Sequence, residues 1–486
     1  MHISVQLKNF MNNINIEVFS GGESKKITAR KGDILSAVLR ENGYRVNTLC
    51  AGNGTCGKCE VLVNGEKKRS CKYVLESDVK VELSENSNIQ SITGAAETLA
   101  FSGKGCFVLD IGTTTLALAL ADCENGETVK VFTADNPQRS FGADVISRIE
   151  KCRDGYLSDM QKVLIEAINK LISKFSEIYD LSRVNTLYAA GNTTMLHLFL
   201  NVDCTSIGVA PYTPAFLESK TLESESLGIN MPLKVITLPG VSSFVGADIV
   251  AGMNLTSLPD ENKYYLLIDL GTNAEVVLYN NKKALCTAAA AGPCFEGANI
   301  SCGMSGSEGA VNSFDIVKGE NKFTTIGNKK AIGICGTGLI DIISALRREE
   351  IIDDTGFMEE DEFTISEGVT LNGRDIRQFQ LAKSAVLSAV ETLAEIEGIE
   401  LENVDKLYIS GGFSSHINID NAVYVGLLPK ALKEKCVPLN NSSLLGSIKY
   451  ALENNDLSCF IKNTEYIDLS AHPSFSERFM DNMYFE

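Results

Sequence analysis

Four cysteines lie close together near the start of the chain, in the stretch CAGNGTCGKCEVLVNGEKKRSC. They are Cys50, Cys56, Cys59 and Cys71, and their spacing is Cys-x5-Cys-x2-Cys-x11-Cys. Clustered thiolates are ligands of zinc and of iron–sulfur clusters. A zinc ribbon uses two short Cys-x2-Cys pairs, whereas this stretch contains one. The spacing favours an iron–sulfur site, with structural zinc or unliganded thiols as the alternatives.

The loop resembles that of plant-type 2Fe–2S ferredoxins, in which three cysteines lie on one loop and the fourth comes from a later strand. One extra residue separates the first two cysteines here. Gly52, Gly54 and Gly57 fit a backbone that folds around inorganic sulfides, because small residues allow unusual φ angles and N–H groups aimed at sulfur. The resemblance implies that the four cysteines ligate a 2Fe–2S cluster.

The pattern Asp-x-Gly-Thr occurs twice, at Asp110–Thr113 and at Asp269–Thr272. Each copy lies between two apolar runs, which predicts a strand, a tight turn and a second strand. The N–H and hydroxyl groups of such a turn can surround phosphate oxygens, and the Asp can hold Mg²⁺ or its waters. Two copies that face each other across a cleft would form a phosphate clamp.

A Gly-Gly pair follows another predicted strand, in YISGGFSSH, and would let the backbone approach a base or ribose closely. Two phosphate hairpins followed by this pair resemble the ATPase superfamily of actin, the heat-shock ATPases and the sugar kinases. GICGTGLIDII, from Gly333, resembles the second connecting helix of that superfamily. No Gly-x4-Gly-Lys-[Ser/Thr] stretch occurs, so a P-loop is not the phosphate site.

The superfamily resemblance implies binding of ATP or ADP with Mg²⁺. The residues predicted to contact the nucleotide are Gly112, Thr113, Thr114, Thr115, Gly191, Asn192, Gly271, Thr272, Asn273, Gly336, Gly411 and Gly412. The residues predicted to be catalytic are Asp110, Asp248 and Asp269.

Asp248 lies in SSFVGADIVAGM, where the sugar-kinase branch carries its catalytic carboxylate at the start of a helix. An Asp at that place could orient the attacking water or a magnesium-bound water. Asp also caps helices well, so a structural role is the alternative. Asp144, in SFGADVISRIE, opens the corresponding helix of the first lobe, and capping or cleft lining is its expected role.

The elements that position these residues fall into two parts. Residues 1–86 are rich in strand formers, and residues 87–103 form a small, polar linker. Two ATPase lobes are predicted, at residues 104–255 and 256–486. VNTLYAAG and VDKLYISGG share a spacing, and each follows a long helical pattern, which indicates two related α/β lobes. The predicted fold class is α+β: a β-grasp 2Fe–2S ferredoxin domain, then a two-lobed α/β actin-like ATPase of ribonuclease H-like fold.

The composition narrows the possible partners. Lys plus Arg is 44 and Asp plus Glu is 62, so the net charge is −18. Such a chain is a poor general binder of nucleic acid or anionic membranes. We find no signal peptide and no run of eighteen apolar residues, so the 14 cysteines are expected in a reducing cytoplasm. Cys286, Cys294, Cys302 and His197 are expected to be packed core residues.

A ferredoxin joined to an ATPase of this superfamily resembles the reductive activators of corrinoid proteins. The segments that carry the resemblance are CAGNGTCGKC, DIGTTT, FGADVISRI, AAGNTTMLHL, AGPCFEGANI, GICGTGLIDII, YISGGFSSHI and YIDLSAHPSFSERFMDNMYF. The resemblance implies ATP-dependent reduction of a Co(II) corrinoid to Co(I), with the corrinoid protein of a methyltransferase system and a low-potential electron donor as partners. Longer members carry an extra domain between ferredoxin and ATPase that this chain lacks.

Two other functions fit the same modules. The chain could deliver electrons to a radical enzyme or a dehydratase, or it could be a sensor in which the cluster gates nucleotide binding. The sequence leaves open which corrinoid protein and electron donor it uses. It also leaves open the oligomeric state, with a homodimer among the options.

Overall fold

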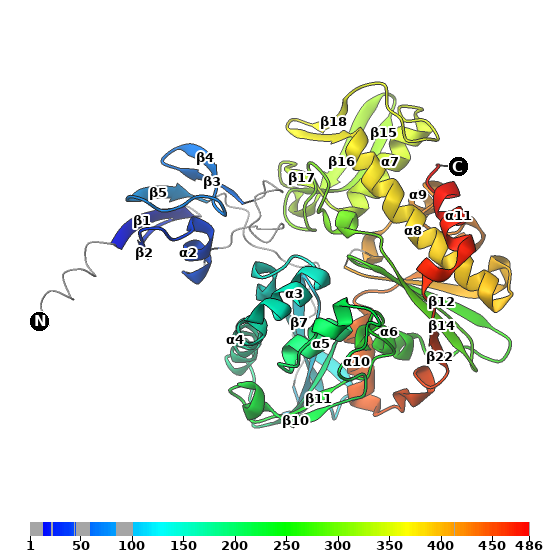
Figure 1. Ribbon diagram of the computed structural model, residues 1–486, viewed down its shortest axis with the longest axis horizontal. Coiled ribbons are helices and arrows are strands. Elements are labelled where there is room, and N and C mark those ends of the chain that lie inside the picture. The colour runs from blue at the N-terminus through cyan, green and yellow to red at the C-terminus, as the bar shows by residue number, and fades with distance from the viewer. Residues whose placement is uncertain are drawn as a thin grey trace, which may run out of the picture. The chain divides into compact units, whose positions relative to one another are not determined.

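The computed structural model describes residues 13–20, 23–42, 44, 59–83, 101–412 and 414–485 (Figure 1). The chain forms two compact units, one built mainly from residues 1–90 and the other mainly from residues 91–486. The predicted linker lies almost entirely outside the described residues, so its boundaries remain a prediction.

The smaller unit is a five-stranded sheet with one described helix. The strands run in the order β2-β1-β5-β3-β4, with β1 and β5 parallel and the other neighbours antiparallel. Helix α2 covers the sheet through Leu35 and Leu39, which pack with Ile16 and Val81 in one core. This arrangement confirms the predicted β-grasp fold. The elements are β1 (Asn13–Ser20), β2 (Glu23–Arg30), α2 (Leu35–Glu41), β3 (Glu60–Val63), β4 (Glu66–Arg69) and β5 (Val79–Glu82).

The larger unit contains two six-stranded sheets with a shared topology. In the first, β6 and β7 form a hairpin, β7 pairs with β8, and β9 and β11 extend the sheet in parallel beyond β6. The second sheet has the same topology: β12 and β13 form the hairpin, β13 pairs with β14, and β20 and β21 extend the sheet in parallel beyond β12. The repeat confirms the two related α/β lobes and the actin-like fold.

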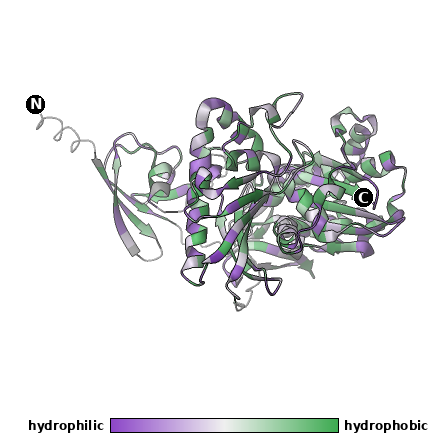
Figure 2. Ribbon diagram, turned by 90° about the horizontal axis from the view of Figure 1, so that it is seen from below, coloured by the Kyte–Doolittle hydropathy of each residue, from purple (hydrophilic) through white to green (hydrophobic). Residues whose placement is uncertain are grey.

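The central strands β6, β7, β12 and β13 are dominated by buried apolar residues, and Figure 2 shows much of the sheets in green. The first sheet contains β6 (Lys104–Ile111), β7 (Thr115–Asp122), β8 (Glu127–Asp135), β9 (Arg183–Gly191), β10 (Thr221–Glu223) and β11 (Lys234–Thr237). The second contains β12 (Tyr264–Leu270), β13 (Ala274–Tyr279), β14 (Ala284–Ala289), β20 (Val404–Ser410), β21 (Cys436–Pro438) and β22 (Thr464–Tyr466).

Helices cover both faces of the first sheet. Helix α4 (Leu157–Ser176) lies on one face, where the ring of Phe175 packs 5.2 Å from that of Phe107. Helix α10 (Ser442–Glu453) lies on the other face, where Leu444 and Ile448 join the core of this sheet. Helix α10 belongs to the range predicted for the second lobe, yet its apolar side is buried against the first.

Helix α6 (Ala247–Thr256) pairs with α10 and also contacts β9 and β12. The two helices therefore lie between the large sheets (Figure 1). Helix α8 (Gly373–Glu397) covers the second sheet, and the C-terminal helix α11 (Pro473–Asp481) packs on α8. The side-chain amide of Gln380 donates to Met483 O over 2.8 Å, so the tail segment that follows α11 packs on α8.

The remaining named elements support these layers. They are α3 (Val145–Lys151), α5 (Thr193–Phe199), β15 (Ala310–Val317), β16 (Glu320–Thr325), β17 (Gly333–Ile334), α7 (Gly336–Arg348), β18 (Glu362–Ser366), β19 (Val369–Asn372) and α9 (Ile419–Tyr424). Among the helices that the structure describes, none combines the length and apolarity needed to span a lipid bilayer.

Candidate functional site

The β3–β4 hairpin brings two of the four clustered cysteines together. Cys59 directly precedes β3, Cys71 follows β4, and their sulfur atoms lie 3.1 Å apart in the interior. Both are buried, at 1% and 6% exposure. Two buried thiols in contact fit a shared metal centre better than isolated packing residues. The hairpin thus brings Cys71 back to Cys59, while Cys50 and Cys56 lie outside the described residues and the set of four ligands stays a prediction.

Each Asp-x-Gly-Thr segment forms the predicted turn between two antiparallel strands. In the first turn Gly112 N–H donates to Thr115 O over 3.0 Å, and in the second Gly271 N–H donates to Asn273 O over 2.9 Å. Within the described residues, no acceptor meets the N–H groups of Thr113 and Thr114. The same is true of Thr272 and Asn273 in the second turn.

The two turns meet at one carboxylate. Glu296, in the 3-10 helix Pro293–Glu296, accepts a hydrogen bond from the Thr272 hydroxyl over 3.0 Å and one from the Thr114 hydroxyl over 3.4 Å. An anionic oxygen therefore lies between hydroxyls of both lobes. The sequence contained Glu296 in AGPCFEGANI without indicating a role, because the residue lies far along the chain from both turns.

The predicted catalytic aspartates lie at the ends of elements that converge on this place. Asp110 follows the buried stretch of β6 as its second-last residue, Asp269 is the second-last residue of β12, and Asp248 lies in the first turn of α6. All three keep intermediate exposure, as residues lining a cleft do. The structure brings these three residues together, and it adds Glu275 of β13, which the sequence did not single out.

The surroundings of these carboxyl groups favour their protonated forms. Burial, together with the charge of Asp269, raises the pKa of Asp248 to about 7. Burial raises the pKa of Asp269 to about 6, against hydrogen bonds with Ser410 and Ser442. Burial also raises the pKa of Asp110, and that of Glu275 lies well above its usual range. A cation in this cleft would relieve the crowding of negative charge.

The start of α10 binds Asp110. The Asn441 side-chain amide donates to Asp110 Oδ2 over 2.6 Å, and the Ser443 hydroxyl donates to Oδ1 over 2.7 Å. Asn441 also caps α10, because its Oδ1 accepts from Leu444 N–H over 2.8 Å. A carboxylate at a helix N-terminus is stabilised by the helix dipole. The run LNNSSLLG therefore takes part in the site, a role that no sequence pattern predicted.

The two helix-opening aspartates differ in their contacts. Asp144 caps α3 through a capping box, since its side chain accepts from Ser147 N–H over 2.8 Å and its own N–H donates to the Ser147 hydroxyl. Its expected capping role is confirmed. The Asp248 carboxylate instead accepts from the N–H of the adjacent Ile249, over 2.9 Å. A catalytic role for Asp248 stays a prediction.

The strand-end glycines take equivalent positions in the two lobes. Gly191 ends β9 and pairs with Ile111 beside the first turn. Gly411 follows β20 with φ +112°, and a Cβ there would lie 2.1 Å from Leu270 O, so only glycine fits. Gly412 has nothing within 4 Å of its Cβ position. Asn192 caps α5, because its side-chain oxygen Oδ1 accepts a hydrogen bond from Met195 N–H over 2.9 Å.

The prediction for GICGTGLIDII was wrong in its placement. That segment forms α7, which packs on β15, α9 and Pro293–Glu296, whereas the helix that pairs with α6 is α10. A Cβ at Gly336 would lie 2.3 Å from Phe295 O. Gly336 is therefore a packing glycine in this structure, because α7 needs a close approach to the segment that carries Glu296.

The other residues that the sequence set aside are packed as expected. His197 is fully buried, its Nδ1 lies 2.7 Å from Thr193 O, and its Nε2 accepts from Ala215 N–H over 3.1 Å. Cys286 and Cys294 are buried, and burial raises their thiol pKa values. Cys302 is only partly buried, since it lies at the border of the second-lobe core.

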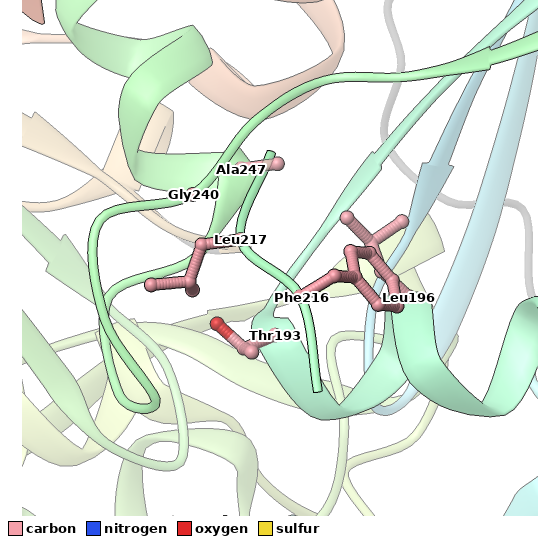
Figure 3. Close-up of a pocket in the computed structure, with 6 residues that line it drawn as sticks. All are labelled: Thr193, Leu196, Phe216, Leu217, Gly240 and Ala247. Carbon is pink, nitrogen blue, oxygen red and sulfur yellow. The ribbon is translucent and has the colours of Figure 1, made fainter. Parts of the chain in front are cut away.

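Two cavities of the larger unit share the lining residues Leu217 and Gly240. Figure 3 shows a cavity of about 10 Å³, lined by Thr193, Leu196, Phe216, Leu217, Gly240 and Ala247. It has room for about one water molecule. A groove of about 540 Å³ adjoins it through Leu217 and Gly240, and none of the predicted nucleotide contacts lines that groove. The small cavity is lined by Thr193 and Ala247, the chain neighbours of Asn192 and Asp248.

The part of the chain that the structure describes contains no group of three or more His, Cys, Asp or Glu side chains arranged to hold a metal ion directly. Two of the four clustered cysteines lie outside that part. For Mg²⁺ the finding fits a common mode of binding, in which one or two carboxylates and the substrate phosphates hold an ion that keeps several waters.

Three family models match the chain in order. A 2Fe–2S iron–sulfur cluster binding domain matches residues 18–85, the RACo middle region matches residues 106–261, and the C-terminal domain of RACo, the ASKHA domain, matches residues 263–486. The first match covers the β-grasp unit. The other two together cover both lobes of the larger unit.

Two curated relatives and one solved structure are similar over most of the chain. The corrinoid activation enzyme RamQ of Eubacterium limosum is 31% identical over 414 residues, covering 77% of this chain and 69% of the relative. The [Co(II) methylated amine-specific corrinoid protein] reductase of Methanosarcina barkeri is 27% identical, covering 73% and 71%. A solved reductive activator for a corrinoid, iron–sulfur protein has a TM-score of 0.72 at 26% identity, covering 97% of this chain and 98% of that one.

Proposed function

Because the chain belongs to the family of corrinoid activation enzymes, we propose that it couples ATP hydrolysis to reduction of the corrinoid of a methyltransferase-associated corrinoid protein. In this reaction Co(II) takes up one electron and becomes Co(I). The electron comes from a 2Fe–2S cluster held by Cys50, Cys56, Cys59 and Cys71, and a low-potential donor replaces it.

The observation that carries the proposal is the geometry of the two turns. Each presents two N–H groups without an acceptor among the described residues, and each directs a threonine hydroxyl at Glu296. Such groups bind phosphate oxygens. A phosphate chain bound between Thr114 and Thr272 would be held by both lobes at once, so nucleotide binding would draw the lobes together.

The carboxylates support hydrolysis at the same place. Asp248 faces Asp269 and Asp110 closely enough for their charges to raise its pKa. When ionised, Asp248 can accept a hydrogen bond from the water that attacks the terminal phosphate. Asp110 and Asp269 would hold Mg²⁺ through its bound waters, and the ion would offset the negative charge of the phosphates.

Cys59 and Cys71 are two of the four proposed ligands of the electron-transferring cluster. A plant-type 2Fe–2S cluster transfers one electron at a potential of about −400 mV. Cys59 and Cys71 hold their sulfur atoms within 3.1 Å in a buried position, which suits two thiolates on one cluster. Reduction of Co(II) to Co(I) needs a stronger driving force than this potential supplies, so free energy from ATP gives the transfer its direction.

The remaining features of the proposal concern the surroundings of the protein. We expect the protein to work in a reducing cytoplasm, where thiols stay reduced and can ligate metal.

The test is electron delivery to a corrinoid protein. Chemically reduced protein with Mg-ATP should generate the Co(I) absorption band of a methyltransferase-associated corrinoid protein, and omission of ATP should prevent it. Cys71→Ser should abolish Co(I) formation and retain ATP binding, whereas Cys123→Ser, an exposed thiol outside the cluster, should retain both. ATP-independent reduction, or no reduction of any corrinoid protein tried, would contradict the proposal and favour delivery to another enzyme.

A further inference from the structure

The first phosphate turn, Gly112–Thr115, has a donor for each of its backbone carbonyls. Asn136 supplies two of them: its side-chain amide donates to Gly112 O and its backbone N–H donates to Thr114 O, each over 2.8 Å. Gly112 N–H serves Thr115 O over 3.0 Å. The fourth donor is the guanidinium of Arg148, which donates to Thr113 O.

Arg148 is an unusual residue for the interior. It lies on α3, its side chain is fully buried, and a second guanidinium nitrogen donates to Met195 Sδ over 3.0 Å. An arginine stays charged at any ordinary pH, and burying a charge is costly unless hydrogen bonds compensate it. The charge of Arg148 places positive potential at the turn, on the side of Thr113 O. Bound phosphates would lie on the opposite side of that turn.

Asn136 is also buried and hydrogen-bonded on its other side-chain atom. It is 1% exposed, and its Oδ1 accepts from Gln138 N–H over 3.0 Å. The buried amide of Gln138 in turn donates to Met160 O over 3.1 Å on α4. A chain of hydrogen bonds therefore anchors the donor of Gly112 O to the helix that covers the sheet.

The second turn, Gly271–Asn273, is supported differently. Its Asn273 O accepts from Gly271 N–H, but no donor from the described part of the chain reaches the carbonyls of Gly271 and Thr272. Its main side-chain contact is the bond from Thr272 to Glu296, which a phosphate could replace. Hydrogen bonds to its carbonyls thus fix the first turn, whereas the second turn is held mainly by the bond from the Thr272 hydroxyl to Glu296.

We propose that Arg148 and Asn136 are positioning residues that hold the first turn in its phosphate-binding conformation before the nucleotide arrives. The carbonyls of Gly112 and Thr113 share their peptide planes with the N–H groups of Thr113 and Thr114. Hydrogen bonds that hold these carbonyls on one side of the turn therefore point the two N–H groups to the other side, toward the cleft. The first lobe then binds phosphate without rearrangement, and the second turn makes the adjustment. The inference rests on the proposed nucleotide site, and it assigns to FGADVISRI a function in Arg148 besides the cap at Asp144.

The experiment compares ligands with and without phosphate. Arg148→Met in the full-length protein should weaken binding of ATP, ADP and pyrophosphate roughly tenfold or more, since a charge-assisted hydrogen bond is lost. Adenosine, which carries no phosphate, should bind with unchanged affinity. Arg148→Lys should lie between the wild type and Arg148→Met, because the charge remains but the planar fork is lost. Turnover at saturating ATP should change less than the KM for ATP.

Two further variants complete the design. Arg183→Met is the matched control, because Arg183 lies on β9 of the same lobe and pairs with Glu124 at the surface over 3.1 Å. It should leave all affinities unchanged. Asn136→Leu keeps the side-chain volume, removes the donor to Gly112 O, and should weaken phosphate-bearing ligands in the same pattern; it serves where Arg148→Met does not fold.

Equal loss of adenosine and ATP binding would mean that these residues only stabilise the fold, and unchanged ATP affinity would mean that the turn needs no support. Either result would overturn the inference. A wild-type protein that binds neither ATP nor pyrophosphate would overturn the nucleotide site itself, and that outcome is recognised before any variant is tested.

Discussion

Thr114 of the first lobe donates its hydroxyl hydrogen to the carboxylate of Glu296 in the second lobe, over 3.4 Å. The same oxygen accepts from Thr272 over 3.0 Å. The two donors lie on the two turns expected to bind phosphate. In this structure a carboxylate therefore takes hydrogen bonds that phosphate oxygens would take when a nucleotide binds.

Replacement of this carboxylate should strengthen binding of magnesium-free ATP. Glu296→Gln keeps the shape of the side chain and removes a negative charge that competes with the phosphates, so the Kd for ATP in EDTA should fall several-fold, as expected for loss of one close like charge. Titration calorimetry measures this. Glu320→Gln, an exposed acid on β16 paired with Lys322, is the control and should bind as the wild type. Weaker binding by Glu296→Gln would show that the carboxylate assists the nucleotide.

Replacement of Asp248 should slow ATP hydrolysis more than ATP binding. Burial and Asp269 raise the pKa of Asp248 to about 7, so the ionised form required to orient water accumulates as pH rises through that value. The kcat/KM of the wild type should rise between about pH 6 and pH 8, and Asp248→Asn should remove most of that rise and most of kcat. Asp144→Asn serves as the comparison, since that side chain is a helix cap. Unchanged turnover in Asp248→Asn would leave it a structural residue.

The crowded carboxyls should make stability depend on pH in the absence of nucleotide and magnesium. Asp248 and Asp269 have folded pKa values of about 7 and 6, above their ordinary value of 3.8. Between the ordinary value of 3.8 and the folded values of about 6 and 7, the folded state therefore binds more protons than the unfolded chain. The free energy of unfolding falls as pH rises across this interval, until both groups are ionised in the folded state.

Thermal melting in EDTA should show this decrease, and Mg-ADP should reduce it. Asp248→Asn removes one of the titrating groups and should flatten the profile. A melting temperature that rises over the same pH interval would mean that the raised pKa values are not a property of the folded protein.

The glycines of the two turns should respond unequally to substitution. A Cβ at Gly112 would lie 2.7 Å from Thr115 O, so Gly112→Ala must distort the first turn, whereas a Cβ at Gly271 meets its nearest atom, Asn273 O, at 3.5 Å. Gly112→Ala should therefore weaken ATP binding and lower the melting temperature, while Gly271→Ala should melt as the wild type. The visible absorption of the 2Fe–2S cluster should be retained in both. Equal melting temperatures for the two variants would contradict this difference.

Local patterns in the sequence predicted much of the fold. The strand, Asn64-Gly65 turn and return strand that follow Cys59 depend on residues close together in the chain, and the structure has them as β3 and β4. The strand–turn–strand segments at Asp110 and Asp269 were predictable for the same reason, since alternating burial and turn chemistry act over a few residues. Their repeated order also predicted two related lobes.

The sequence placed one connecting helix wrongly. Helices α7 and α10 are both amphipathic and both begin with small or polar residues, so their patterns do not tell which of them faces α6. Packing decides it: Leu444 and Ile448 of α10 fill the free face of the first sheet. This placement carries Asn441 and Ser443 to Asp110, more than three hundred residues away in the chain.

The sequence by itself determined the chemical groups and their local settings: the cysteine spacing, the two Asp-x-Gly-Thr turns and the Gly-Gly pair. The tertiary structure alone decided which distant groups complete the site. Glu296, Asn441 and Arg148 reach the turns through contacts between lobes, helices and strands, and no short-range pattern records such contacts. Side chains become neighbours across long stretches of chain only after the apolar faces of the elements have been buried, so their roles follow from packing.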